Sequence, residues 1–151
     1  MKRQRILGML LISLALVSAC DYGAKSSAGF RLPDGDPKVG EAVFARLECT
    51  NCHTVKDSSF DKSPEGEINV QLGGRVHRVQ TYGDLVTSII NPSHRLAQKY
   101  PKNAVSEDGE SLMRNYNSVM TIQELVDLVA FLQGTYKVVP PPGRYQPYAY
   151  R

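Results

Sequence analysis

The chain has 151 residues, of which 42% are hydrophobic and 22% charged, and this length accommodates one ordinary domain. Its formal charge is +3, but three basic residues, Lys2, Arg3 and Arg5, precede a long apolar run at the N-terminus. Without these three, the basic residues only equal the fifteen acidic ones, which argues against a nucleic-acid-binding protein because that function needs a basic face.

Residues 1–19 have the pattern of a secretory signal peptide. The uncharged run Ile6–Ala19 is shorter than the roughly twenty residues that a membrane-spanning helix needs. The run ends in Leu-Val-Ser-Ala-Cys, which resembles a bacterial lipobox, whose cysteine becomes the lipid-modified first residue of the mature protein. We therefore expect a lipid on Cys20 and a location on the periplasmic side of a bacterial membrane. Ordinary signal cleavage nearby, leaving Cys20 free or removing it, is the alternative.

Residues 20–35 are rich in small and polar residues and have no periodic apolar face, which predicts a flexible, lipid-anchored tether. A helix is expected to begin next, because Asp36 can cap a helix whose first turn holds Pro37. Apolar residues then recur on one helical face up to Cys49; they are Val39, Ala42, Val43 and Leu47. This helix leads directly into the motif that carries the chemistry.

Residues 49–53 read Cys-Thr-Asn-Cys-His, the pattern of covalent c-type haem attachment. The thiols of Cys49 and Cys52, three positions apart at a helical turn, can each add to a vinyl group of one haem. The adjoining imidazole of His53 then lies under the iron as its proximal ligand. The cysteine count agrees with one haem c, because Cys20 goes to lipid and no odd thiol remains in an oxidising compartment.

Two other chemistries use a pair of cysteines at this spacing. A thioredoxin-like thiol pair lies in a βαβ setting, and no alternating or β-branched strand runs surround this pair. A zinc site needs further Cys or His ligands at short spacing, whereas the remaining histidines, His77 and His94, are scattered. Haem attachment is therefore the favoured interpretation.

Two further helices are predicted after the motif. The first covers residues 81–90 and is closed by Asn91-Pro92, because proline disfavours helix at its predecessor. The second begins with a capping box at residues 121–124 and has Gly134 just past its end. Apolar residues occupy more than one face of this helix, so we expect it to be covered on two sides. The Pro/Tyr-rich tail over residues 140–151 cannot be helical and is expected to be extended.

Four side chains could fill the sixth position on the iron, namely Met113, Met120, His77 and His94. Met120 immediately precedes a helix cap, where an apolar side chain usually packs on the residue four inside the helix, here Leu125. Met113 lies in a polar stretch where a core role is harder to supply, and its thioether is a soft, neutral ligand that favours reduced iron. Met113 is the expected ligand, with Met120, a histidine or an open site as the alternatives.

The chain resembles a class I cytochrome c over roughly residues 38–137. The resemblance rests on Gly40 and Phe44 before the motif, and on Met-Arg-Asn-Tyr at residues 113–116 followed by the apolar helix that begins at the capping box. It implies an all-α cytochrome c fold over residues 36–139, with about three to five short helices wrapped around one covalently bound haem.

The resemblance also implies roles for single residues. In this family a glycine like Gly40 lets the first helix cross the last closely, with aromatic residues like Phe44 and Phe131 at the contact. Met113 matches the axial methionine of the family. Gly73-Gly74-Arg75 is similar to a segment whose arginine contacts a haem propionate, so Arg75 is a candidate for that contact.

A single haem with both axial positions filled by protein leaves no place for a substrate on the iron, so the sequence predicts a one-electron carrier and not an enzyme. The expected partners are redox proteins, a donor and an acceptor, met at the membrane through the lipid anchor or at local patches such as the acidic residues 107–110. One alternative is a haem protein or enzyme that binds gas or peroxide at a vacant or labile sixth site. Another is an electron-transfer subunit of a larger respiratory complex. The expected apolar haem wall comprises Phe44, Leu72, Leu85, Ile89, Val129 and Leu132.

Overall fold

The computed structural model describes residues 30–61 and 68–140. The chain divides into two compact units, Met1–Arg31 and Leu32–Arg151, so the architecture described is that of the second unit. The predicted signal peptide, the lipidation site Cys20 and the tail beyond residue 140 lie outside the described residues. Within the described ranges, none of the helices is both long enough and apolar enough to span a membrane.

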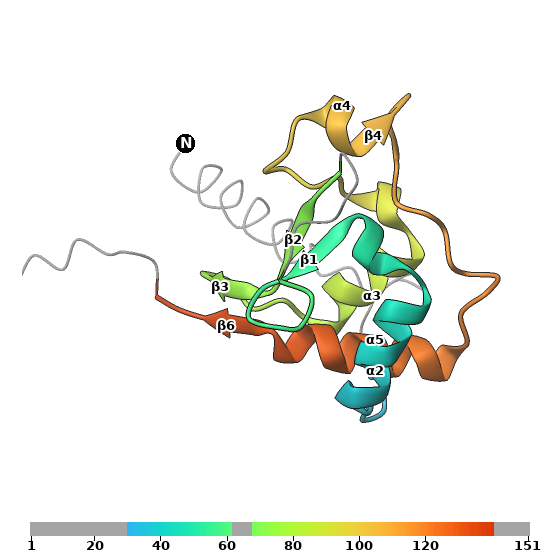
Figure 1. The fold of residues 1–151 in the computed structure, drawn as a ribbon, viewed down its shortest axis with the longest axis vertical. Helices are drawn as coiled ribbons and strands as arrows, with labels where there is room; N and C mark the ends of the chain where they lie inside the picture. The colour runs from blue at the N-terminus through green and yellow to red at the C-terminus, as the bar shows by residue number, and fades with distance from the viewer. Residues whose placement is uncertain (1–29, 62–67, 141–151) are drawn as a thin grey trace, which may run out of the picture. The chain divides into compact units, whose positions relative to one another are not determined.

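Helices form the body of the second unit in its described part (Figure 1). Short 3-10 helices come one or two residues after the ends of α2 and α3, and α4 is a single turn that the sequence pattern did not predict. The helices are α2 (Pro37–Arg46), η2 (Cys49–Asn51), α3 (Tyr82–Ile90), η3 (Pro92–His94), α4 (Lys102–Val105) and α5 (Ile122–Gly134).

The starts of the three longer helices follow local sequence. The carboxylate of Asp36 accepts a hydrogen bond from the backbone N–H of Lys38 at 2.8 Å, which caps α2. Capping boxes begin the other two helices, and their members are Thr81 and Asp84 in α3 and Thr121 and Glu124 in α5. The three predicted helices are confirmed, although α2 ends at Arg46 rather than reaching Cys49, and α5 includes Gly134.

Three two-stranded sheets contradict the predicted all-α fold. Two are parallel and one is an antiparallel hairpin; the pairs are β1 (His53–Val55) with β2 (Val70–Leu72), β3 (Gly74–Val76) with β6 (Tyr136–Val138), and β4 (Ser106–Glu107) with β5 (Glu110–Ser111). The described chain therefore has mixed α and β structure, and the prediction of an all-α cytochrome c fold is wrong. The prediction failed because strands of two or three residues are too short to leave an alternating pattern in the sequence.

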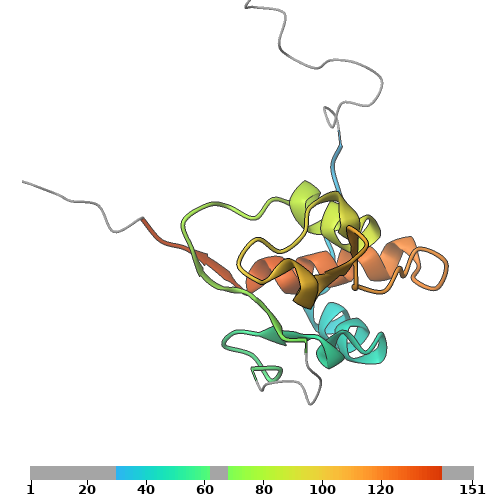
Figure 2. The ribbon, with the colours of Figure 1, turned by 90° about the horizontal axis from the view of Figure 1, so that it is seen from above.

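The crossing of α2 and α5 organises the core (Figures 1 and 2). Gly40 lies at this crossing, and a Cβ atom added there would lie 2.0 Å from the carbonyl oxygen of Asp127. One turn along α2, Phe44 is 1% exposed, and its ring centroid is 5.8 Å from that of Phe131. The expected close crossing with aromatic rings at the contact is confirmed.

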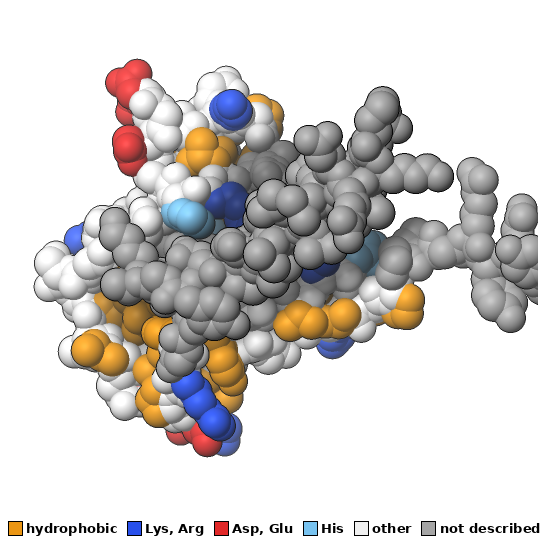
Figure 3. All heavy atoms as spheres, turned by 180° about the vertical axis from the view of Figure 1, so that it is seen from behind, with side chains coloured by type: hydrophobic (Ala, Val, Ile, Leu, Met, Phe, Trp, Pro, Cys, Tyr) orange, Lys and Arg blue, Asp and Glu red, His pale blue; other side chains and the backbone are white. Residues whose placement is uncertain are grey.

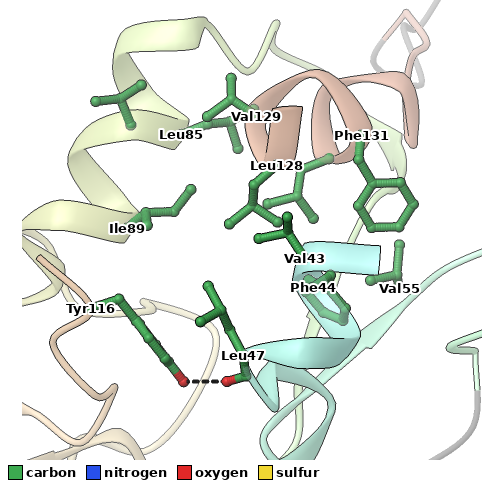
Figure 4. Packing of buried hydrophobic residues seen from close by; sticks show 12 residues of the cluster. Val43, Phe44, Leu47, Val55, Leu85, Ile89, Tyr116, Leu128, Val129 and Phe131 are labelled. Carbon is green, nitrogen blue, oxygen red and sulfur yellow. Dashed lines mark hydrogen bonds between the residues drawn. The ribbon is translucent and has the colours of Figure 1, made fainter. Parts of the chain in front are cut away.

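A buried apolar cluster fills the space between α2, α3 and α5 (Figure 4). Because α5 contributes to this cluster and contacts both other helices, the prediction that it is covered on two sides is confirmed. Five of the six residues predicted as an apolar wall belong to the cluster, and Leu72 packs against it. The cluster comprises Val43, Phe44, Leu47, Val55, Leu85, Val86, Ile89, Tyr116, Leu128, Val129, Phe131 and Leu132.

Candidate haem attachment site

The Cys-x-x-Cys-His motif occupies a sharp turn between α2 and β1. Leu47 caps the end of α2, and Glu48 then adopts a φ of 57°, a left-handed conformation that is uncommon for a residue other than glycine. The 3-10 helix η2 follows, and the N–H of Cys52 donates a hydrogen bond to the carbonyl of Cys49 at 3.2 Å. A single tight turn therefore separates the two cysteines.

Both motif thiols are free and partly buried. Burial raises the pKa of the Cys49 thiol to about 11, against an opposing backbone hydrogen bond, and Cys52 contributes a smaller rise. The Cys49 thiol is therefore protonated at neutral pH, whereas redox-active thiol pairs depend on a lowered pKa and a reactive thiolate. This electrostatic setting disfavours the thioredoxin-like interpretation.

His53 is held as a neutral imidazole, and among the described residues only its Nδ1 atom has a hydrogen-bond partner. Burial lowers the pKa of His53, against a smaller opposing effect of its hydrogen bond to Val70. The Nδ1 atom lies 3.1 Å from the Val70 carbonyl oxygen, to which the neutral ring donates its proton. The lone pair then resides on Nε2, so this nitrogen can bind a metal, and the backbone carbonyl fixes the orientation of the ring.

The pairing of β1 with β2 brings the Val70 carbonyl oxygen close to the His53 ring. His53 lies opposite Val70 in the parallel register, and the N–H of Val70 donates to the carbonyl of Cys52 at 2.8 Å. Sequence reasoning missed Val70 as a contributor to the site, because no spacing rule relates a backbone carbonyl to a histidine seventeen positions away.

Met113 and Met120 lie in the segment that connects β5 to α5. Both are partly buried and pack against the core cluster, as do Leu125 and Cys49. The expectation that a core role is hard to supply for Met113 is therefore wrong, because tertiary packing places its side chain against the apolar cluster. Burial alone does not distinguish the two thioethers, and Met113 as an iron ligand stays a prediction.

Tyr116 is a second residue whose place in the site sequence reasoning missed. Its hydroxyl donates a hydrogen bond of 2.9 Å to the carbonyl oxygen of Leu47, immediately before the motif turn (Figure 4). Burial raises the pKa of the Tyr116 hydroxyl, and the Cys49 thiol adds to that rise. The segment carrying Met113 is thereby joined to the segment carrying the cysteines.

The remaining candidate residues lie on exposed positions. Arg75 is exposed on β3, and none of the ion pairs within the described residues involves it, so its contact with a propionate stays a prediction. The exposed His77 has its Nδ1 atom 3.2 Å from the Val139 carbonyl oxygen, and His94 is exposed in η3. In the part of the chain that the structure describes, no three His, Cys, Asp or Glu side chains form a group that could hold a metal ion.

The acidic residues 107–110 lie on the β4–β5 hairpin, where Asp108 and Gly109 form a turn with φ values of 49° and 85°. All three carboxylates of this hairpin are exposed. Figure 3 shows acidic side chains gathered on a projection of the surface. Their use as a docking patch stays a prediction.

The donor set fits a covalently attached haem. Two free thiols lie on one turn, a neutral imidazole adjoins them with Nε2 available, and two thioethers pack on the same apolar cluster as Cys49. Comparisons of the chain with models of known protein families, with curated proteins and with solved structures found no match.

Proposed function

We propose that this protein is a one-electron carrier with a single, covalently attached haem c. The observation that carries the proposal is the Cys49-x-x-Cys52-His53 motif on one tight turn, with the imidazole Nδ1 hydrogen-bonded 3.1 Å from the Val70 carbonyl oxygen. A haem bound in this way supplies reversible one-electron exchange at its iron. The covalent attachment chemistry requires both thiols at this spacing, which a structural cysteine pair does not.

Each residue of the site has a distinct task in this proposal. Cys49 and Cys52 form thioether links to the porphyrin, and His53 binds iron through Nε2 while Val70 holds the ring in orientation. Met113 is the distal ligand, and its soft thioether favours the reduced state. Arg75 contacts a propionate. With both axial positions occupied, no substrate binds the iron, so the protein is not an enzyme.

The apolar cluster between the helices keeps water from the buried face of the site. A low-dielectric surrounding that changes little with the redox state keeps the cost of reorganisation low during electron exchange. The predicted signal peptide indicates where the protein acts, because a lipid on Cys20 would hold the mature protein on the periplasmic side of a bacterial membrane. Donor and acceptor are then redox proteins that reach the same membrane surface.

The decisive experiment is production of the full chain in a bacterium that carries the c-type haem maturation machinery. We expect a red protein whose pigment survives acid and organic extraction, with a peptide containing Cys49 and Cys52 that carries the mass of one haem. The Cys49→Ala/Cys52→Ala double variant should lose this covalent mass, and His53→Ala should lose stable ligation of the iron. A colourless wild-type protein with no haem mass would refute the proposal.

The optical spectrum of the same protein separates a carrier from a ligand-binding haem protein. A low-spin spectrum with a sulfur-to-iron charge-transfer band in the oxidised state supports the carrier. A high-spin spectrum that shifts on addition of carbon monoxide would instead identify a gas- or peroxide-binding site. Purification from membranes, either alone or with partner chains, distinguishes a free carrier from a subunit of a respiratory complex.

A further inference from the structure

Tyr116 belongs to the segment that carries Met113, and it is hydrogen-bonded to Leu47 at the end of α2 (Figure 4). The residue is 8% exposed, and its hydroxyl donates to the Leu47 carbonyl oxygen at 2.9 Å. Leu47 caps α2 and lies two residues before Cys49. A buried hydrogen bond thus joins two segments that are 69 positions apart in the chain.

The Leu47 carbonyl lies between the backbone hydrogen bonds that end α2 and those that begin η2. On one side, the N–H of Glu48 donates to Ala45 at 3.0 Å and closes α2. On the other, the N–H of Asn51 donates to Glu48 at 3.0 Å and opens η2. Among the described residues, the Tyr116 hydroxyl is the donor to the carbonyl between them. Removing that donor would leave a buried carbonyl unpaired, which costs more than an ordinary hydrogen bond contributes.

Other hydrogen bonds hold the same segment, and one of them is the backbone bond from the N–H of Leu112 to the carbonyl oxygen of Val105 at 3.0 Å. At its start, the N–H of Ser111 donates to the hydroxyl of Ser93 at 3.0 Å, in a partly buried position. After Tyr116, the side-chain amide of Asn117 donates to the carbonyl of Ile90 at 2.8 Å, in an exposed position. Because water can replace a lost partner at an exposed or partly buried bond, loss of the buried Tyr116 bond should cost more than loss of either of these side-chain bonds.

We infer that Tyr116 is a positioning residue for the Met113 ligand, acting through its hydrogen bond to the Leu47 carbonyl. The inference rests on the proposed function, in which Met113 and His53 are the two axial ligands. Met113 lies three residues before Tyr116, and His53 lies six residues after Leu47. The hydrogen bond therefore links the two ligands through few residues of backbone, and it limits how far Met113 can withdraw from the iron.

Tyr116→Phe removes the hydroxyl and keeps the ring in the core, so it tests the hydrogen bond alone. Added imidazole must displace Met113 from oxidised iron, and its apparent affinity reports how firmly Met113 is held. We expect the holoprotein of this variant to keep its covalent haem, to bind imidazole about tenfold more tightly than the wild type, and to lose its sulfur-to-iron band at a lower temperature. Amide hydrogen exchange in residues 112–121 should be faster.

Two control variants separate positioning from general effects. Tyr82→Phe makes the same chemical change at a 45% exposed tyrosine in the first turn of α3, and should leave imidazole affinity unchanged. Val126→Ala removes packing at a 2% exposed residue of α5 that does not belong to the core cluster. It should lower the stability of the protein without changing imidazole affinity.

The outcomes keep this inference distinct from the proposed function. A Tyr116→Phe protein with wild-type imidazole affinity and a wild-type sulfur-to-iron band would overturn the positioning role while leaving the carrier intact. Equal increases in affinity in Tyr116→Phe and Val126→Ala would also overturn it, because they would trace the effect to global stability. A wild-type protein without haem would instead remove the proposed function itself.

Discussion

A single hydrogen bond determines which nitrogen of His53 is free to bind a metal. The ring of a buried, neutral histidine can carry its proton on either nitrogen, and the two tautomers present different atoms to a ligand. In this protein the Val70 carbonyl lies 3.1 Å from Nδ1 and retains the proton there, so Nε2 remains an electron-pair donor. The motif spacing predicts that His53 is the ligand, and the backbone of β2 supplies its orientation.

In the proposed haem site, a single residue would provide the second axial ligand of the iron. Met113 and Met120 both pack on the core cluster, and the N–H of Met120 donates to the carbonyl of Tyr116 at 2.9 Å. We predict that Met113→Ala abolishes the sulfur-to-iron band of the oxidised holoprotein. Met120→Ala should keep the band and lower the free energy of unfolding by about 2 kcal/mol, the lower end of the range for a truncated core side chain, because Met120 is only partly buried.

Optical spectra and denaturant titrations of the two methionine variants check this prediction, with the wild-type holoprotein as the control. Loss of the band in Met120→Ala together with its retention in Met113→Ala would exchange the two assignments.

At the scale of elements, the contact between α2 and α5 depends on one missing side chain. A Cβ atom on Gly40 would lie 2.0 Å from the Asp127 carbonyl oxygen and 2.8 Å from the Cβ atom of Phe131. A backbone carbonyl inside a helix cannot move aside as the end of a flexible side chain can. The helices would have to separate, and the packing of Phe44 against Phe131 would be lost with them.

Gly40→Ala should therefore lower the free energy of unfolding by about 3 kcal/mol or more, at the upper end of what overpacking costs. The matched control is Gly83→Ala in α3, where the nearest atom to an added Cβ is the Thr81 hydroxyl oxygen at 3.8 Å. Because alanine has the higher helix propensity, this control should be neutral or stabilising by about 0.5 kcal/mol. Equal stability of the two variants in denaturant titrations would contradict the close crossing.

Short strands rather than helices complete the candidate site. The β1–β2 pair brings Val70 to His53, and the β4–β5 hairpin leads into the segment with Met113. None of these strands is longer than three residues, so the backbone pairing that defines them comes from the surrounding fold.

An ion pair between Arg46 and Glu124 joins the end of α2 to the start of α5, and its exposure makes its contribution to stability small.

At the scale of the whole molecule, the chain has two predicted covalent modifications, a haem and a lipid, that do not depend on each other. The haem is expected on Cys49 and Cys52 within the second unit, whereas the lipid is expected on Cys20 in the N-terminal segment. Because the two modifications use different cysteines and different chemistry, either can be removed while the other remains.

We predict that Cys20→Ser removes the lipid and shifts the exported protein from the membrane fraction to the soluble periplasmic fraction. The haem content per protein should not change, since the attachment thiols are intact. Several buried acyl chains bind a membrane strongly, at about 0.8 kcal/mol per methylene, so the shift should be nearly complete. Fractionation followed by haem staining checks this outcome. A Cys20→Ser protein that stays with the membrane would contradict the lipid anchor and point to a membrane-bound partner.

The amino-acid sequence by itself determined the features of this protein that arise within a few neighbouring residues. The thiols and the imidazole of the Cys-x-x-Cys-His motif lie near one another because their residues are neighbours in the chain. The capping residues Asp36, Thr81 and Thr121 accept hydrogen bonds from backbone N–H groups in the first turn of the helix that each one begins. Such patterns are visible in the sequence because the interacting groups are never far apart along the chain.

Only the tertiary structure decided the two parallel strand pairs, the apolar surroundings of Met113, the Val70 carbonyl on His53 and the Tyr116 hydroxyl on Leu47. Each of these contacts joins groups 17 or more positions apart, or depends on burial by several elements together. No local periodicity encodes such a contact. It exists because packing of the helices brings backbone carbonyls and side chains from distant segments within hydrogen-bonding distance.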